Sequence, residues 1–283
     1  MAGSPASFIF LMLLLGLLIG SFLNVVIYRL PIMMEKEWRS QCAELLENSQ
    51  SETGDSFNLM TPSSRCPACD RPIKAYENIP LLSYLFMRGR CACGKTGISP
   101  QYPLIEALTG ILSGIVAWRF GFGVSTATAL LLTWALIALS VIDIQKQLLP
   151  DNITLPFLWL GIALALFGIF TDLESSVIGT MAGYLSLWSV YQLFRLLTGK
   201  EGMGYGDFKL LAMLCAWQGW QYLVAIIIVS SLVGALVGIT LIVLRGRDRN
   251  IPIPFGPFLA AAGWITLLWG DTVNRLYLDW AGL

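Results

Sequence analysis

Uncharged, apolar runs of about 20 residues recur along this chain, and they constrain its fold more than any other feature. A run of that length crosses a bilayer as a helix, because a segment in lipid must satisfy its own backbone hydrogen bonds. Of the 283 residues 56% are hydrophobic and only 13% are charged, about half the charged fraction of a soluble domain. The runs lie at residues 8–28, 103–118, 122–142, 152–171, 175–194, 210–244 and 251–270.

The number of spans follows from the lengths of these runs. Residues 210–244 are too long for one span, and Gln218-Gly219-Trp220-Gln221 is a plausible tight turn that divides them. The run at 103–118 contains an acidic residue, Glu106, which is either a substrate contact or an interfacial charge, and we favour the interfacial charge. We therefore predict an all-α, polytopic transmembrane bundle of about eight spans.

The orientation of the bundle follows from its basic residues, because Lys and Arg accumulate in the loops that stay inside. No Lys or Arg precedes Arg29, so the N-terminus is expected outside, and the first run is expected to be a retained span rather than a cleaved signal peptide. With alternating spans, all of the 18 Lys and Arg except Arg119 and Arg275 lie inside. We expect a first membrane helix at 1–30, a cytosolic insert at 31–102 and a membrane bundle at 103–283.

The composition excludes several kinds of chemistry. The sequence has no histidine, so it has no Ser-His or Cys-His nucleophile pair, no His-ligated metal and no imidazole base. Its formal net charge is zero, which leaves no basic field for nucleic acid. Any proton transfer must use Asp, Glu, Lys, Tyr or Cys.

Two close cysteine pairs lie in the insert, Cys66-Pro-Ala-Cys69 and Cys91-Ala-Cys93. This spacing is typical of a tetrahedral, structural zinc site, in which four thiolates leave no position open for water. Such a site would stabilise a small domain with little core of its own. The alternative is four unrelated free thiols, since cytosolic conditions argue against disulfides. We expect no special role for Cys42 or Cys215.

Two aspartates lie at the inner ends of predicted spans. Asp143 ends one apolar run, and Asp207 closes the segment Gly202-Met-Gly-Tyr-Gly-Asp207 and opens the next run. Acidic residues near a bilayer core suggest function, and two carboxylates at similar depth can face each other across a bundle. Such a pair shares one proton, so one member can activate water while the other polarises a peptide carbonyl.

A plainer interpretation remains open for each acidic residue. Asp207 at a helix start would gain from capping and from the helix dipole. Asp143 could pair with Lys146, and Asp151 after Pro150 is expected to be an N-cap.

These residues together resemble the type IV prepilin leader peptidase/N-methyltransferase family of bacterial inner membranes. The resemblance covers nearly the whole chain, and an isolated Gly-x-Gly-Asp would be a weak signal beside it. Its motifs are the segment 20–31, the two cysteine pairs, the segments 76–84 and 98–106, and the two aspartate motifs at 142–151 and 204–211. The second cysteine pair is one residue shorter than the family's usual pair.

The resemblance implies a function and a site. Asp143 and Asp207 match the family's catalytic aspartates, and Cys66, Cys69, Cys91 and Cys93 match its zinc cysteines. Family members cut prepilins and pseudopilins after a short basic leader at the cytoplasmic face of the membrane, and many then methylate the new amino terminus with S-adenosylmethionine. The sequence locates no S-adenosylmethionine site, although the segments 20–31 and 76–93 are candidates. The implied partners are these precursors and membrane lipid, not nucleic acid.

Four other functions compete with this one, of which a purely structural assembly protein would tolerate the loss of either aspartate. A peptidase without methyltransferase activity is the main alternative. A presenilin-type protease would place Tyr before the first aspartate, where this chain has Ile142. A proton-coupled transporter would place its carboxylates near the bilayer midplane and show an internal repeat, and neither feature is visible.

Overall fold

The computed structural model describes residues 4–45, 57–61, 80–87, 89–91, 97–245 and 253–281. Within these residues the regular elements are helices, and an isolated β-bridge joins Arg90 to Gly97. This agrees with the predicted all-α class. The chain divides into two units, Met1–Thr126 and Ala127–Leu283, and each is described by itself.

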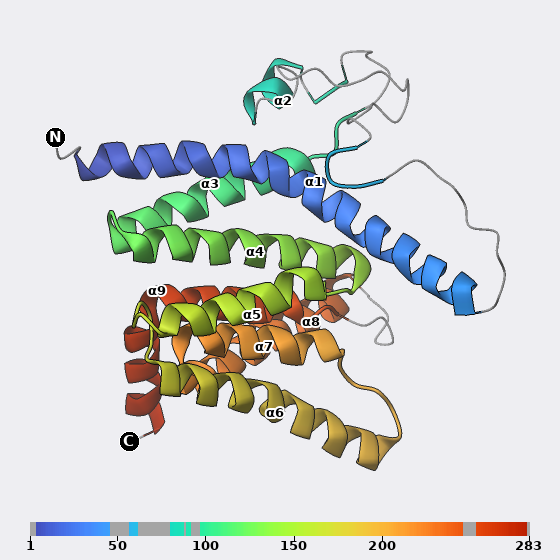
Figure 1. The fold of residues 1–283 in the computed structure, drawn as a ribbon, viewed down its shortest axis with the longest axis vertical. Helices are drawn as coiled ribbons and strands as arrows, with labels where there is room; N and C mark the ends of the chain where they lie inside the picture. Colours follow the sequence, from blue (N-terminus) through green and yellow to red (C-terminus); the bar gives the residue numbers. More distant parts are fainter. Residues whose placement is uncertain are drawn as a thin grey trace. The chain divides into compact units, whose positions relative to one another are not determined.

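The first unit consists of α1 (Pro5–Leu45), the short α2 (Leu82–Phe86) and α3 (Gln101–Phe120). The α1 helix has 41 residues and continues through a buried proline, Pro31. A proline inside a helix removes one backbone hydrogen bond and is a common cause of a bend, and Figure 1 shows α1 changing direction along its length. The first apolar run and the polar segment that follows it therefore form one helix.

The α1 and α3 helices approach closely because small residues face each other. A Cβ built on Gly16 would lie 2.7 Å from the backbone oxygen of Thr109 and 2.5 Å from Oγ of Ser113. A Cβ built on Gly20 would lie 2.7 Å from the Cα of Glu106. Gly-x-x-x-Gly contacts of this kind hold membrane helices together by close backbone packing, and they fix which residues of α1 lie opposite which residues of α3.

The second unit is built around a central helix, α7. It contains most of α4 (Val124–Lys146), and its other elements are α5 (Asp151–Ala165), α6 (Leu173–Thr198), α7 (Tyr205–Gln218), the 3₁₀ turn η2 (Trp220–Tyr222), α8 (Leu223–Arg245) and α9 (Gly256–Ala281). The α7 helix is buried from Leu210 to Gln218, as expected of a helix that is apolar on every side. Figure 1 shows it between α5 and α6.

The C-terminal end of α7 is tied to three neighbouring helices. The Ser176 hydroxyl of α6 donates to the Ala216 carbonyl at 2.6 Å, and the Trp217 indole N–H donates to the Phe157 carbonyl of α5 at 2.7 Å. The Gln218 amide donates to the Gly263 carbonyl of α9 at 3.0 Å. These bonds hold α7 in place, and its start then presents Asp207 at a fixed position.

The predicted division of the run 210–244 is confirmed. The α7 helix ends at Gln218, Gly219 adopts a positive φ of 88°, and the chain passes through η2 into α8. The predicted span at 103–118 is also helical, because all of its residues belong to α3.

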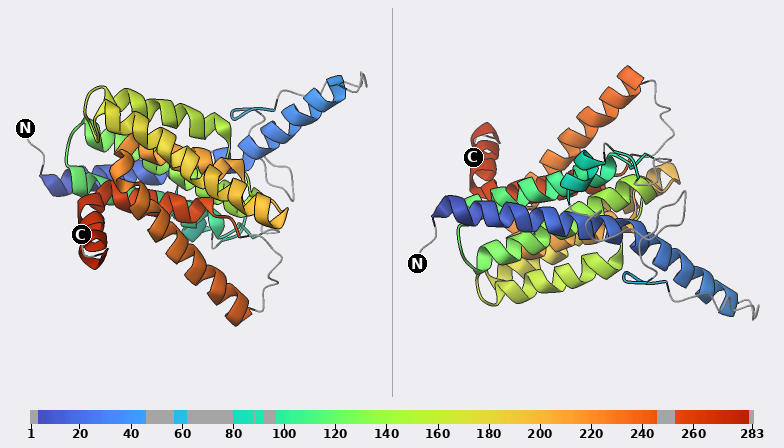
Figure 2. Two further views of the ribbon diagram at one scale, coloured as in Figure 1. Left: turned by 90° about the horizontal axis from the view of Figure 1, so that it is seen from below. Right: turned by 90° about the horizontal axis from the view of Figure 1, so that it is seen from above.

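Four helical segments in the described part of the chain are long and apolar enough to cross a membrane. They are Pro5–Leu45, Gln101–Phe120, Val124–Lys146 and Trp220–Val243. The α8 helix leaves the bundle at an angle (Figure 2) and exposes a row of large apolar side chains that includes Leu232, Leu236 and Ile239, as a lipid-facing helix would. The protein is therefore helical and membrane-embedded in character, whereas the number of about eight spans stays a prediction.

Candidate active site

Asp143 lies in the last turn of α4, and its carboxylate is bound by the start of a distant helix. Its exposed fraction is 6%. The backbone N–H of Gly256, the first residue of α9, donates to Oδ2 of Asp143 at 3.0 Å. A carboxylate at a helix N-terminus is favoured both by the free N–H groups and by the helix dipole. The pairing of Asp143 with Lys146 that the plainer interpretation offers stays a prediction.

Asp207 lies in the first turn of α7, three residues after the helix cap Gly204, and is 8% exposed. Asp207 lies near enough to Asp143 to feel the charge of its carboxylate. The two aspartates that the sequence singled out are therefore brought together, from the C-terminal end of α4 and the N-terminal end of α7.

A single apolar side chain, Leu149, lies against the backbone beside both acids. A Cβ built on Gly206 would lie 2.8 Å from Cβ of Leu149, and a Cβ built on Gly256 would lie 3.2 Å from its Cδ2. Gly206 precedes Asp207, and Gly256 holds Asp143. Leu149 thus occupies the space that side chains at these two glycines would need, and the close approach explains why glycine suits both positions.

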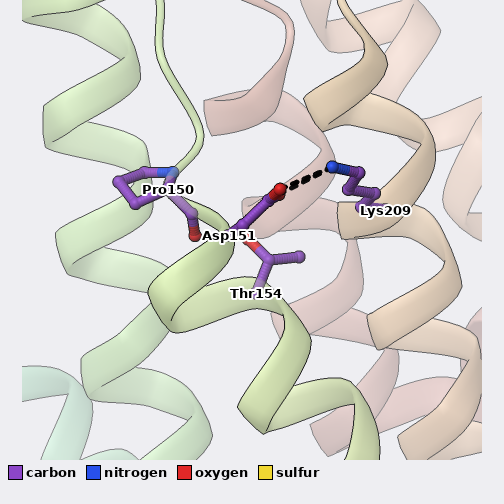
Figure 3. Close-up of polar contacts among 4 residues, drawn as sticks. All are labelled: Pro150, Asp151, Thr154 and Lys209. Carbon is purple, nitrogen blue, oxygen red and sulfur yellow. Dashed lines mark hydrogen bonds and ion pairs between the residues drawn. The ribbon is translucent and has the colours of Figure 1, made fainter. Parts of the chain in front are cut away.

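An ion pair lies next to this arrangement, as Figure 3 shows. The ammonium Nζ of Lys209 lies 2.7 Å and 2.9 Å from the two carboxylate oxygens of Asp151. Lys209 follows Asp207 by two residues on α7, and Asp151 begins α5, two residues after Leu149. The pair therefore links the two backbone segments that carry Asp207 and Leu149.

The expectation that Asp151 is an N-cap was wrong by one position. Pro150 is the cap, with an extended ψ of 123°, and Asp151 is the first residue of α5. Thr154 donates its hydroxyl to the Pro150 carbonyl at 3.1 Å. The Asp151 carboxylate still lies in the first turn, where a negative charge is favoured, and it is free of a capping role, so it can bind Lys209.

The predicted zinc cysteines fall mostly outside the described residues. Cys66, Cys69 and Cys93 lie outside them, and Cys91 is half-buried. Among the residues that the structure does describe, no group of three or more His, Cys, Asp or Glu side chains could hold a metal ion. The chain on both sides of the second pair is described, and there the Ile98 N–H donates to the Gly89 carbonyl at 2.7 Å.

Glu106 is a buried residue rather than a solvated interfacial charge. Its exposed fraction is 8%, and its Oε2 accepts a hydrogen bond from the Leu81 N–H at 2.9 Å. Cys42 is exposed and Cys215 is buried.

Sequence reasoning missed Gly256, Leu149 and Lys209 as parts of the site. One signal for Gly256 was present, because Pro254-Phe-Gly-Pro257 before an apolar run marks a helix start. By the predicted topology that start lies at the same membrane face as Asp143. Nothing local signals that Leu149 packs against Gly206.

The fold and the site define a class: a helical membrane protein with two buried, interacting carboxylates at the ends of two helices. Two family models match the chain, "Bacterial Peptidase A24 N-terminal domain" at residues 14–120 and "Type IV leader peptidase family" at residues 130–239. Both aspartates lie in the second match. No solved structure matches the chain.

Curated relatives match along almost their full length, and each is named prepilin leader peptidase/N-methyltransferase. The protein from Stutzerimonas stutzeri is 55% identical over 283 residues, which is 100% of this chain and 98% of the relative. That from Pseudomonas aeruginosa is 53% identical over 282 residues, 100% and 97% of the two chains. That from Neisseria gonorrhoeae is 50% identical over 270 residues, 94% and 92%. The chain belongs to the prepilin leader peptidase/N-methyltransferase family.

Proposed function

We propose that this protein cuts the leader from prepilins and prepilin-like precursors, with Asp143 and Asp207 as its catalytic pair, and methylates the new amino terminus. Cleavage and methylation follow from membership of the family. The assignment of the two aspartates is supported by one observation above all, the convergence of two buried carboxylates from α4 and α7.

The pair suits hydrolysis by an activated water. Two carboxylates close together share a proton and titrate as a unit. The ionised member takes a proton from water as that water attacks the scissile carbonyl, while the protonated member donates to the carbonyl oxygen. The Gly256 N–H occupies Oδ2 of Asp143, which leaves Oδ1 of that carboxylate for proton transfer. The mechanism requires no histidine.

The position of the pair suits a substrate with a basic leader and an apolar segment. We propose that the protein lies in a bacterial inner membrane with its N-terminus in the periplasm. The insert and the aspartates then lie at the cytoplasmic face. A basic leader would stay at the cytosolic surface while the apolar segment enters the bilayer, so the scissile bond would lie at the interface. Pilus and pseudopilus precursors share this organisation.

The domain organisation that we propose has a membrane helix at 1–30, a cytosolic insert at 31–102 and a peptidase bundle at 103–283. The α1 helix continues from the first of these into the second. We also retain the count of about eight spans, of which four are supported by helix length and composition.

A zinc ion bound by Cys66, Cys69, Cys91 and Cys93 is part of the proposal. Four thiolates are a donor set that suits Zn²⁺ in a closed, structural site. The bridge between Arg90 and Gly97 brings together the two ends of the loop that carries Cys91 and Cys93, as a metal-binding turn requires. The ion would stabilise the insert and take no part in peptide hydrolysis.

Cleavage of a prepilin by purified wild type, Asp143→Asn and Asp207→Asn tests the catalytic pair. We expect each replacement to lower cleavage by about 10²–10⁴-fold, the usual contribution of general acid–base catalysis. Mass spectrometry of the product counts leader removal and the added methyl group together. Cleavage at the wild-type rate by either folded variant would contradict the mechanism.

Asp172→Asn is the matched control. Asp172 caps α6, and its hydrogen bond from the Ser175 N–H at 2.9 Å holds the pKa of that carboxyl below its usual value. It is therefore ionised at the pH of the assay, so the control removes a full negative charge by the same change from Asp to Asn. Asparagine caps a helix as well as aspartate, and cleavage should be unchanged.

A further inference from the structure

A second group of buried polar residues lies in the first unit, between α1 and α3. It consists of Ser21 and Asn24 on α1, Tyr102 and Glu106 on α3, and the backbone of Leu81, and we call it the α1–α3 polar cluster. The residues lie on two adjacent levels, because Ser21 and Asn24 are three apart on one helix and Tyr102 and Glu106 are four apart on the other. The cluster lies in the middle of α1 and in the first two turns of α3.

Asn24 provides the first sign that the cluster binds a ligand. Its exposed fraction is 5%. Its side-chain amide N–H₂ donates to the carbonyls of Gly20 and Tyr102, each at 3.2 Å. Its Oδ1 is buried and has no hydrogen-bond partner in the described part of the chain. A buried acceptor without a donor is destabilising, so this oxygen has capacity for an N–H or O–H of a bound molecule.

Glu106 provides the second sign. The partners that the structure gives its carboxylate are neutral donors, the Leu81 N–H at 2.9 Å and the Ser21 hydroxyl. A buried carboxylate is compensated best by a cation that also donates hydrogen bonds. Glu106 lies about one helical turn along α3 from Tyr102, whose carbonyl accepts from Asn24, so the two acceptors lie on neighbouring turns.

Leu81 provides the third sign. Its φ is 57°, a left-handed conformation that is costly for a leucine. The hydrogen bond to Glu106 helps to hold this conformation. Backbone strain of this kind persists where surrounding contacts enforce it, and it is found frequently at functional sites.

We propose that the α1–α3 polar cluster binds the newly cut α-amino group of the mature chain, with Glu106 as the base that prepares it for methylation. The inference rests on the proposed methyltransferase function. The sequence left two segments, 20–31 and 76–93, as candidates for the methyltransferase site. The cluster contains residues of both segments, and they meet at the Glu106 carboxylate. An α-ammonium group carries three N–H donors, which fits an acceptor without a donor and a carboxylate without a cation among the residues that the structure describes.

The chemistry requires a base because an α-amino group has an ordinary pKa of about 7.7–8.0 and is mostly protonated at neutral pH. The Glu106 carboxylate accepts one proton from the ammonium, and Asn24 Oδ1 accepts a second N–H and orients the nitrogen lone pair. S-adenosylmethionine, when bound, supplies the methyl group, and its carbon–sulfur bond breaks toward sulfur as the nitrogen–carbon bond forms. The proton on Glu106 then returns to solvent.

The test uses the full chain and a synthetic peptide with the sequence of a mature pilin amino terminus, so that no cleavage is needed. Equilibrium binding is measured for this peptide and for the same peptide acetylated at its amino terminus. Wild type should bind the free amine at least tenfold more tightly, and Glu106→Gln, which keeps an oxygen for the Leu81 N–H, should lose that preference. The rate of methylation by Glu106→Gln should fall by about 10²–10⁴-fold.

Three further measurements separate this role from a structural one. Prepilin cleavage by Glu106→Gln and its affinity for S-adenosylhomocysteine should stay at wild-type values. Asn24→Leu, which removes the unpaired acceptor, should raise the KM for the peptide and leave that for S-adenosylmethionine unchanged. Glu174→Gln, which neutralises an exposed carboxylate on α6, is the control and should change nothing.

The outcomes distinguish the inference from the function beneath it. Absence of methyl transfer by wild type would overturn the proposed methyltransferase function itself. Methylation by wild type, with an unchanged preference for the free amine in both variants, would overturn only the assignment of the cluster. Glu106→Gln could also lose S-adenosylhomocysteine binding and keep the preference for the free amine. This result would overturn the assignment as well, because the cluster would then hold the methyl donor.

Discussion

Replacing Gly256 with alanine should displace the carboxylate of Asp143, one of the two aspartates that we propose as the catalytic pair, without changing the chemistry of that group. The new Cβ would lie 2.6 Å from Oδ2 of Asp143 and 3.2 Å from Cδ2 of Leu149. Ordinary contacts begin at 3.4 Å, so the carboxylate must move by about 0.8 Å, a displacement on the scale that costs enzymes much of their rate. The 3.0 Å hydrogen bond from the Gly256 N–H would lengthen beyond its useful range.

Two estimates of the magnitude agree. A misplacement of about 1 Å in a catalytic constellation costs about 10²-fold in rate. A hydrogen bond to a charged group contributes about 1.5–3 kcal/mol, which corresponds to about 10- to 100-fold. We therefore expect kcat/KM for prepilin cleavage by Gly256→Ala to fall by about 10²-fold.

The assay is cleavage of a prepilin by purified protein in lipid bilayers, quantified by mass spectrometry. Gly204→Ala is the matched control, because the atoms nearest its new Cβ, Oδ2 of Asp207 and the Gly206 nitrogen, both lie 4.0 Å away. It should stay within about threefold of wild type. Methylation of a pre-cut peptide by Gly256→Ala would show that the protein is folded. Cleavage by Gly256→Ala within threefold of wild type, or equal damage from Gly204→Ala, would refute the reasoning.

Three further predictions concern Gly206, Lys209 and Cys66. Gly206→Ala places a Cβ 2.8 Å from that of Leu149 and should lower the rate of cleavage by about tenfold or more. A double variant with Leu149→Ala should recover part of the lost rate. Strict additivity of the two effects would count against the contact. Lys209→Met should lower the free energy of unfolding by only about 0.2–1 kcal/mol but slow cleavage severalfold. If the ion pair positions α7, a double variant that exchanges the charges of Lys209 and Asp151 should restore the rate. Cys66→Ser should remove bound zinc, measured by atomic emission, and leave cleavage intact; undiminished zinc would exclude Cys66 as a ligand.

The features of the fold that follow local rules were predictable from the sequence. A run of apolar residues that is too long for one span must be interrupted, and Gly219 marks the interruption because a positive φ suits glycine. The helix ends that carry Asp143 and Asp207 were predictable in the same way, since charge and glycine mark the limits of an apolar run.

The contacts that complete the site depend on packing between distant segments. Gly256 is 113 residues from Asp143 in sequence, and no periodic pattern links them. The burial of Glu106 has a similar origin, because it depends on the close approach of Gly20 on another helix. Asp151 shows the limit of a local rule, since a one-residue shift in the helix start changes a cap into an ion-pair partner.

The contacts of Leu149 have a consequence for the catalytic cycle. In the mechanism that we propose, each turnover adds a proton to the pair of aspartates and removes it again, so the repulsion between them rises and falls. A leucine held by van der Waals contact against Gly206 and Gly256 does not respond to charge. It acts as a spacer of constant size, so the gap offered to the next peptide bond is the same whichever protonation state the pair has reached.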